Sequence, residues 1–231
     1  MKGAPKISND ILKCLKASGA LLEDTHLVLT SGKHSDAYVN LRAIAGNTDA
    51  LTLITNEILD QLLDHHDQID PKGEIFASES LCIVGPETIG RCLAQSAADA
   101  ILDANYAWCK PNADHTAQEW DPKLPFADTV KGKYCYIVDD VLTSAKTLIQ
   151  TIDLLKQSDC KILGAIVVID RSAGITAQSL GIPWLQALVR LDLTTYEPDD
   201  CPLCKRRRPM RLRPGHGHEW IKDHPDYPTL E

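Results

Sequence analysis

Residues 134–147 read YCYIVDDVLTSAKT, in which an apolar run leads into two adjacent acids and then into a segment rich in hydroxyl side chains. The apolar run 134–138 predicts a buried strand, and the spacing of apolar residues over 147–155 predicts a helix. Two carboxylates at a strand end can accept hydrogen bonds from vicinal hydroxyls, such as those of a ribose. Small hydroxyl residues at a helix start offer side-chain and backbone donors to a phosphate. The stretch therefore predicts a site for a phosphorylated ribose.

Taken one at a time, the same residues have simpler interpretations. Asp139 and Asp140 could merely end a strand, and Thr143 or Ser144 could cap the helix that follows. The ordered combination of apolar strand, two acids, two apolar residues and a hydroxyl-rich helix start is what favours a binding site.

Apolar strands and helices also alternate on both sides of this stretch. The further strands expected are 81–84, 106–109, 162–169 and 184–188, and the further helices are 51–63, 89–102 and 177–180. Residues 7–18 predict a helix, residues 27–29 and 38–41 predict short extended segments, and residues 65–74 and 111–133 predict polar connections. Apolar strands separated by helices indicate an α/β fold with a parallel sheet covered on both faces. Ligands bind such sheets beyond the carboxyl ends of the strands, which directs attention to residues 85–90, 139–147 and 170–174.

Composition narrows the classes of protein. The 231 residues are 44% hydrophobic, and the net charge of -8 argues against a general nucleic-acid binder, which needs clustered Lys and Arg. A basic cluster over 205–213 is either a solvated surface or a patch for an anion or a partner. No apolar run is long enough to span a membrane, and no secretory signal is visible. Eight scattered cysteines are typical of reduced thiols, so we expect a cytoplasmic protein.

The stretch at 134–147 resembles the phosphoribosyl pyrophosphate (PRPP) loop of type I phosphoribosyltransferases. Residues 29–40 resemble the N-terminal hood segment of the orotate phosphoribosyltransferase branch, and residues 85–90 resemble its pyrophosphate loop. Residues 168–171 with 181–183 resemble its late strand, and residues 201–204 are similar to the tail of some members. The likeness covers residues 10–215 in order. It implies one phosphoribosyltransferase domain over 1–231, with hood segments of about 1–45 and 190–231 around a core of about 46–189.

The resemblance also implies roles for individual residues. Asp139 and Asp140 would hold the ribose hydroxyls and, with Lys110 and His115, would carry catalysis. The 5′-phosphate would contact Thr143, Ser144, Ala145, Lys146 and Thr147. The pyrophosphate would contact Gly85, Pro86, Glu87 and Thr88, and orotate would contact Arg171 and Lys33. Mg²⁺ would travel with PRPP, and the enzyme would be a homodimer in which the mobile loop of one subunit reaches the active site of the other.

Two segments depart from the family pattern. The mobile loop normally reads Arg-Lys-x-x-Lys-x-His-Gly, but here Cys109, Ala113 and Thr116 replace the Arg, the second Lys and the Gly. In the PRPP loop, Ala145 and Lys146 stand where glycines are usual. Besides orotate phosphoribosyltransferase activity, these departures leave a second function open. The chain could be a catalytically weak or silent homologue that binds PRPP or a nucleotide and regulates another process. A phosphoribosyltransferase for another base also stays open.

The tail carries a separate pattern. Cys201 and Cys204 form a Cys-x-x-Cys pair, and His216 and His218 follow. These four residues could hold zinc, although His-x-His is tighter than the usual spacing; the simpler alternative is a turn without metal.

Overall fold

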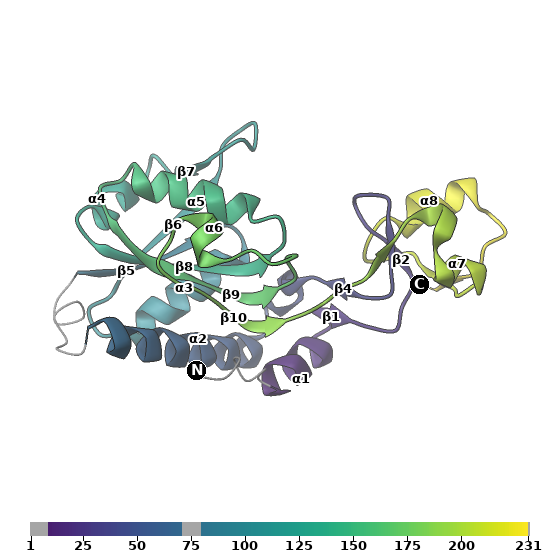
Figure 1. Ribbon diagram of the computed structural model, residues 1–231, viewed down its shortest axis with the longest axis horizontal. Coiled ribbons are helices and arrows are strands. Elements are labelled where there is room, and N and C mark those ends of the chain that lie inside the picture. Colours follow the sequence, from purple (N-terminus) through teal and green to yellow (C-terminus); the bar gives the residue numbers. More distant parts are fainter. Residues whose placement is uncertain (1–8, 71–79, 231) are drawn as a thin grey trace. The chain divides into compact units, whose positions relative to one another are not determined.

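The computed structural model describes residues 9–70 and 80–230, and the chain divides into two compact units (Figure 1). Unit 1 comprises Ile44–Leu191 together with the start of the chain up to Ile11, and unit 2 comprises Leu12–Ala43 and Asp192–Glu231. Unit 2 thus takes in most of the residues expected to form the hood, whereas Asn9–Ile11 group with unit 1. None of the helices within the described residues is long and apolar enough to cross a membrane.

Unit 1 is built on a six-stranded sheet in the order β10-β9-β8-β5-β6-β7. Every neighbouring pair is parallel except β6 and β7, which are antiparallel. The strands are β5 (Leu81–Pro86), β6 (Asn105–Pro111), β7 (Gln118–Trp120), β8 (Tyr134–Leu142), β9 (Lys161–Asp170) and β10 (Leu185–Arg190). The predicted α/β class with a parallel sheet is confirmed.

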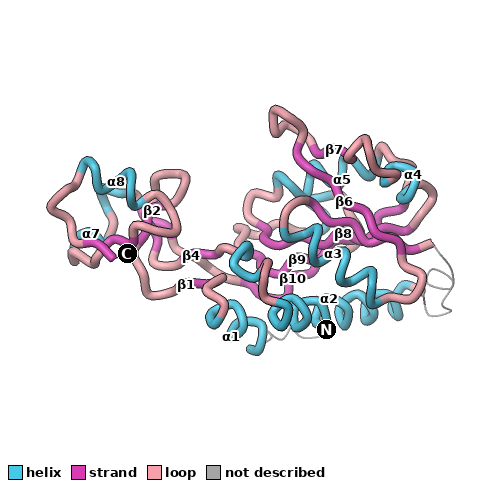
Figure 2. Tube along the Cα trace, turned by 180° about the vertical axis from the view of Figure 1, so that it is seen from behind, coloured by secondary structure: helices cyan, strands magenta, loops and turns pink. Residues whose placement is uncertain are grey.

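Helices cover both faces of this sheet. In unit 1, α2 and α3 lie on one side, and α4, α5 and α6 lie on the other, as the front and back views show (Figures 1 and 2). Their bounds are α2 (Thr48–Ile69), α3 (Ile89–Ala100), α4 (Phe126–Val130), α5 (Lys146–Lys156) and α6 (Ala177–Leu180). Leu148, Ile152 and Leu155 point from α5 into a core shared with β5, β8 and β9. Full burial of such side chains contributes about 1.5–3 kcal/mol each, which explains why the apolar periodicity located these elements.

Two expected connections contain regular structure. The helix α2 runs to Ile69, and in its last turns His65 stacks on Trp184 with ring centroids 4.4 Å apart. The segment 111–133 includes β7 and α4, where Trp108 and Trp120 pack around Phe126. Aromatic packing therefore orders polar stretches in which periodicity shows no element; residues 71–74 of the first connection lie outside the described residues.

Unit 2 interleaves the early and the late parts of the chain in small sheets. The strand β3 (His34–Ser35) lies between β2 (Leu27–Val28) and β11 (Thr195–Tyr196), and β1 (Leu21–Leu22) pairs with β4 (Tyr38–Val39). β12 (Met210–Arg211) pairs with β13 (Thr229–Leu230). The helical elements at its ends and within it are α1 (Asn9–Ala17, shared with unit 1), η1 (Leu41–Ile44, likewise at the boundary), η2 (Pro198–Asp200), α7 (Pro202–Lys205) and α8 (Gly217–Asp223).

Candidate active site

Asp139 and Asp140 lie in the carboxyl-terminal half of β8 rather than after it. The strand continues to Leu142 because Asp139 and Val141 keep their pairing with Val167 and Ile169 of β9. The backbone N–H of Asp140 donates to Oδ1 of Asp139 at 2.8 Å, and the N–H of Val141 donates to Oδ1 of Asp140 at 2.8 Å. The pair is therefore held on a rigid central strand.

The two carboxyl groups differ in environment. Asp139 is buried, whereas Asp140 is half-buried. Burial, and then the charge of Asp140, raise the pKa of Asp139 well above its usual value. Two acids side by side in a partly dry site favour ligands that supply hydroxyl donors or a cation.

The start of α5 is open for an anion. Ala145 occupies the N-cap position with φ 60° and ψ 12°, and no side chain caps the helix. Thr143 and Ser144 are exposed just before it. The alternative that one of them caps the helix is thus not what the structure shows. An uncapped start presents unpaired backbone N–H groups and the positive end of the helix dipole.

Ala145 shows what the family glycine would do at this position. Its left-handed backbone costs about 1–2 kcal/mol for a residue with a side chain and nothing comparable for glycine. The methyl group of Ala145 is buried in the core of unit 1, which offsets part of that cost. The turn therefore keeps the left-handed conformation although the glycine is missing.

A second turn follows the neighbouring strand β5. Gly85 and Gly90 bracket it, and a Cβ built on Gly85 would lie 2.2 Å from the carbonyl oxygen of Gly90. A Cβ on Gly90 would lie 3.1 Å from Oδ1 of Asp139. The Glu87–Thr88 peptide is cis, and Thr88 precedes α3 without a side-chain cap. The absence of a side chain at Gly85 thus lets the end of β5 pack against the start of α3, and its absence at Gly90 lets the start of α3 pack against Asp139.

Arg171 lies at the same end of the sheet as the acid pair, beyond the carboxyl ends of the parallel strands. It follows β9, and its backbone N–H donates to the carbonyl of Leu142 at 2.9 Å. Because β9, β8 and β5 are consecutive in the sheet, the structure brings together Arg171, the acid pair, the α5 start and the turn 85–90.

The segment 109–116 forms most of the β6–β7 hairpin. Cys109 is buried in β6, where burial raises the pKa of its thiol to about 12. Lys110 lies 3.9 Å from Glu119 and 3.8 Å from Asp121, nitrogen to carboxylate oxygen. His115 is exposed at the hairpin tip with φ 57°, and its carbonyl accepts from Gln150 of α5 at 3.4 Å. Lys110 thus pairs with its own hairpin rather than with Asp139 and Asp140.

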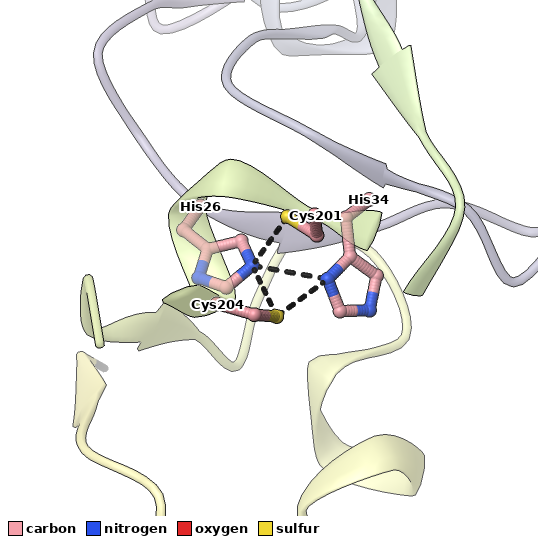
Figure 3. A group of neighbouring side chains, drawn as sticks. All are labelled: His26, His34, Cys201 and Cys204. Atoms are coloured by element: carbon pink, nitrogen blue, oxygen red, sulfur yellow. Dashed lines mark hydrogen bonds between the residues drawn. The ribbon is translucent and has the colours of Figure 1, made fainter. Parts of the chain in front are cut away.

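Unit 2 holds the remaining predicted residues. Lys33 pairs with Glu197, with 2.7 Å between Nζ and Oε1. Cys201 and Cys204 do lie in a cluster of metal-ligating groups, but its histidines are His26 and His34 (Figure 3).

The later histidines do not take part in this cluster, so the expected ligand set is corrected at two of its four positions. His216 and His218 are exposed, and His216 lies 3.7 Å from a Glu219 oxygen. The Cys-x-x-Cys pair was a sufficient signal to look for histidines, but nothing in the local sequence points upstream to residues so far away along the chain.

Comparisons with known proteins bear on the family and the fold of this chain. A family model described as a phosphoribosyl transferase domain matches residues 54–180. An orotate phosphoribosyltransferase of Thermotoga maritima is 31% identical over 206 residues, covering 89% of this chain and 97% of the relative. Another from Caldanaerobacter subterraneus is 26% identical over 191 residues, covering 82% and 88%. The crystal structure of orotate phosphoribosyltransferase from Aeropyrum pernix superimposes with a TM-score of 0.56 at 22% identity, covering 78% of this chain and 93% of that one.

Proposed function

The chain belongs to the phosphoribosyl transferase family, and from that membership we propose that it is an orotate phosphoribosyltransferase. The reaction would join the anomeric carbon of PRPP to a ring nitrogen of orotate, with release of pyrophosphate and formation of orotidine monophosphate. The observation that carries the proposal is the acid pair Asp139 and Asp140 on β8, directly before the uncapped start of α5.

We assign each part of PRPP to a place at the carboxyl end of the sheet, and the geometry of that end supports the assignment. The acid pair accepts hydrogen bonds from the ribose hydroxyls, as charge-assisted bonds of about 1.5–3 kcal/mol each. The 5′-phosphate takes the N–H groups at 143–147, beside the charge of Lys146. The turn 85–90 receives the pyrophosphate at the start of α3. Every one of these groups belongs to unit 1.

Mg²⁺ bound to PRPP would supply positive charge to the departing pyrophosphate. Asp140 fits such a hard, partly hydrated cation because its carboxylate is half-exposed, whereas Asp139 is buried. Positive charge near the leaving group is the main catalytic demand, because the breaking C–O bond leaves its electron pair on the pyrophosphate while the anomeric carbon becomes oxocarbenium-like.

Orotate carries a carboxylate, which matches Arg171 beyond β9. A guanidinium can bind it with two parallel hydrogen bonds. Lys33 is the second cation assigned to orotate; its exposed ion pair with Glu197 is worth only about 0–1 kcal/mol and is easily exchanged for a substrate anion.

The β6–β7 hairpin would act as the mobile loop. The tip of the hairpin is exposed to solvent. Its turn is held by hydrogen bonds among its own polar side chains, such as the bond that Oγ1 of Thr116 donates to Oδ1 of Asp114 at 2.6 Å. The ion pairs of Lys110 are long and partly exposed, so Lys110 can leave them at small cost. We place Lys110 and His115 at the pyrophosphate of a neighbouring subunit in a homodimer of a cytoplasmic enzyme.

A second candidate function is a silent homologue that binds PRPP and regulates another process. Ala113 is the observation that favours it, because the family lysine at this place would neutralise the pyrophosphate. Cys109 adds to it, because a buried thiol replaces a cation.

Orotate-dependent release of pyrophosphate from PRPP separates these functions. Turnover with orotate and not with adenine supports the proposal. PRPP binding without turnover on any base supports the silent homologue, and turnover on another base alone would replace orotate as the substrate.

Calorimetry with PRPP tests the site itself. The double variant Asp139→Asn with Asp140→Asn should lose at least ~2 kcal/mol of binding free energy, or about 30-fold in affinity. Asp153→Asn, an exposed acid on α5, is the matched control and should bind normally. Unchanged affinity in a folded double variant would remove the acid pair from the site.

A further inference from the structure

Four side chains converge inside unit 2 from two distant parts of the chain (Figure 3). His26 immediately precedes β2 and His34 lies in β3, whereas Cys201 follows η2 and Cys204 lies in α7. Their potential ligand atoms all lie within 4.8 Å of one another. We propose that His26, His34, Cys201 and Cys204 bind a structural zinc ion.

The spacing of the ligand atoms fits tetrahedral zinc. Bonds of about 2.05 Å to nitrogen and 2.3 Å to sulfur place tetrahedral ligands roughly 3.3 Å apart for two nitrogens and roughly 3.5 Å apart for nitrogen and sulfur. Here Nε2 of His26 lies 3.1 Å from Nδ1 of His34. Nε2 of His26 lies 3.8 Å from Sγ of Cys201 and 3.6 Å from Sγ of Cys204, which in turn lies 3.2 Å from Nδ1 of His34.

The surroundings orient His26 for a metal. Its Nδ1 lies 2.9 Å from the carbonyl oxygen of Arg208, so Nδ1 carries the proton and donates it there. The lone pair of Nε2 is then free and points at the other three ligands. A hydrogen bond from the second ring nitrogen to a carbonyl is the usual partner of a metal-bound histidine.

Most of the cluster is shielded from solvent. His26, His34 and Cys201 are fully buried, and only Cys204 is partly exposed. Trp220 packs edge-on against His34 with centroids 5.4 Å apart, and Tyr227 packs edge-on against His26 at 5.9 Å. Four protein ligands and no open position are typical of a structural rather than a catalytic zinc site.

The ligand types select the metal. Two thiolates with two imidazoles suit zinc, whereas Mg²⁺ and Ca²⁺ prefer oxygen ligands. The thiolate is the form of cysteine that binds zinc, so two cysteine ligands need positive charge beside them. Zinc supplies that charge.

The ion would link the two segments of the chain that make up unit 2. His26 and His34 come from its early part, and Cys201 and Cys204 come from its late part. Small units with short strands bury little apolar surface, and a structural metal is one way to stabilise them. Because the proposed PRPP groups are in unit 1, loss of zinc should not abolish PRPP binding.

The test is metal analysis of the full chain purified under reducing conditions from zinc-supplemented culture. We expect about one zinc per chain, and Cys201→Ser and His34→Ala should each reduce bound zinc at least about tenfold. The matched controls Cys14→Ser and the pair His216→Ala with His218→Ala should keep it. Chelation of the wild type should lower Tm by at least about 5 °C.

A second measurement uses the wild type alone, so it tests the proposal even if the variants do not fold. Wild-type protein stripped of metal and loaded with Co²⁺ should show a thiolate-to-cobalt charge-transfer band and tetrahedral ligand-field absorption, both displaced by zinc. Three results would overturn the proposal. They are no metal uptake by reduced protein, a Cys201–Cys204 disulfide in protein freshly isolated without oxidant, and loss of zinc only in the His216 and His218 controls.

Discussion

Replacing Gly85 with alanine tests whether the turn between β5 and α3 is packed as tightly as the structure indicates. The added Cβ would lie 2.2 Å from the carbonyl oxygen of Gly90, 2.4 Å from its carbon and 2.8 Å from Cβ of Ala94. An ordinary carbon–oxygen contact is about 3.3 Å or more. The start of α3 must therefore move by about 1 Å, because the atoms in the way are backbone and cannot rotate aside.

The expected cost follows from two opposing effects. Overpacking of this kind costs about 1–3 kcal/mol, and a rigid backbone contact falls at the upper end. Replacing glycine by alanine also reduces the freedom of the unfolded chain, which returns about 0.4–1 kcal/mol. The net loss is about 2 kcal/mol, or a fall in Tm of roughly 4–8 °C for a unit of this size.

Urea denaturation and PRPP calorimetry are the assays. Gly46→Ala is the matched control, because a Cβ there meets nothing within 4 Å, and it should leave stability unchanged or slightly higher. PRPP affinity should fall at least about tenfold in Gly85→Ala, since a displacement of about 1 Å spoils alignment of the donors. If Gly85→Ala is as stable as the control and binds PRPP normally, the turn is not packed in this way.

Three further predictions concern the site and the assembly. Burial raises the pKa of Asp139 above its ordinary 3.8, so folding disfavours its carboxylate, and wild-type stability falls as the pH rises from about 4 through the folded pKa. Urea midpoints should therefore show Asp139→Asn gaining stability over wild type on going from about pH 4 to about pH 8; a difference independent of pH would contradict the buried charge. Ala113→Lys should raise orotate turnover, by up to about 10²-fold, with PRPP affinity nearly unchanged, because a cation at the departing pyrophosphate acts in the transition state; no rise in steady-state turnover would mean that another lysine has this role. Light scattering should give twice the chain mass of 25.4 kDa, and an active monomer would rule out the shared-loop dimer.

The sequence alone determined the framework of unit 1. The strands at 134–138 and 162–169 and the helix at 147–155 were recognisable because burial on both faces of a parallel sheet demands continuous apolar runs. The order of acid pair, hydroxyl segment and helix was enough to predict a site for a phosphorylated ribose, because the groups proposed to bind it are contiguous in the chain. The expected class of fold and the expected family are confirmed.

Tertiary structure alone decided the features that depend on distant partners. Asp139 stays within β8 because β9 continues beside it, and β7 forms because it pairs back on β6. Ala145 is left-handed because the strand must turn into α5, a conformation that its residue type does not announce. His26 and His34 meet Cys201 and Cys204 only when the early and late segments of unit 2 fold together. Local sequence patterns show which positions along the chain are buried. They do not show which distant residue each buried position contacts, because long-range packing sets those contacts.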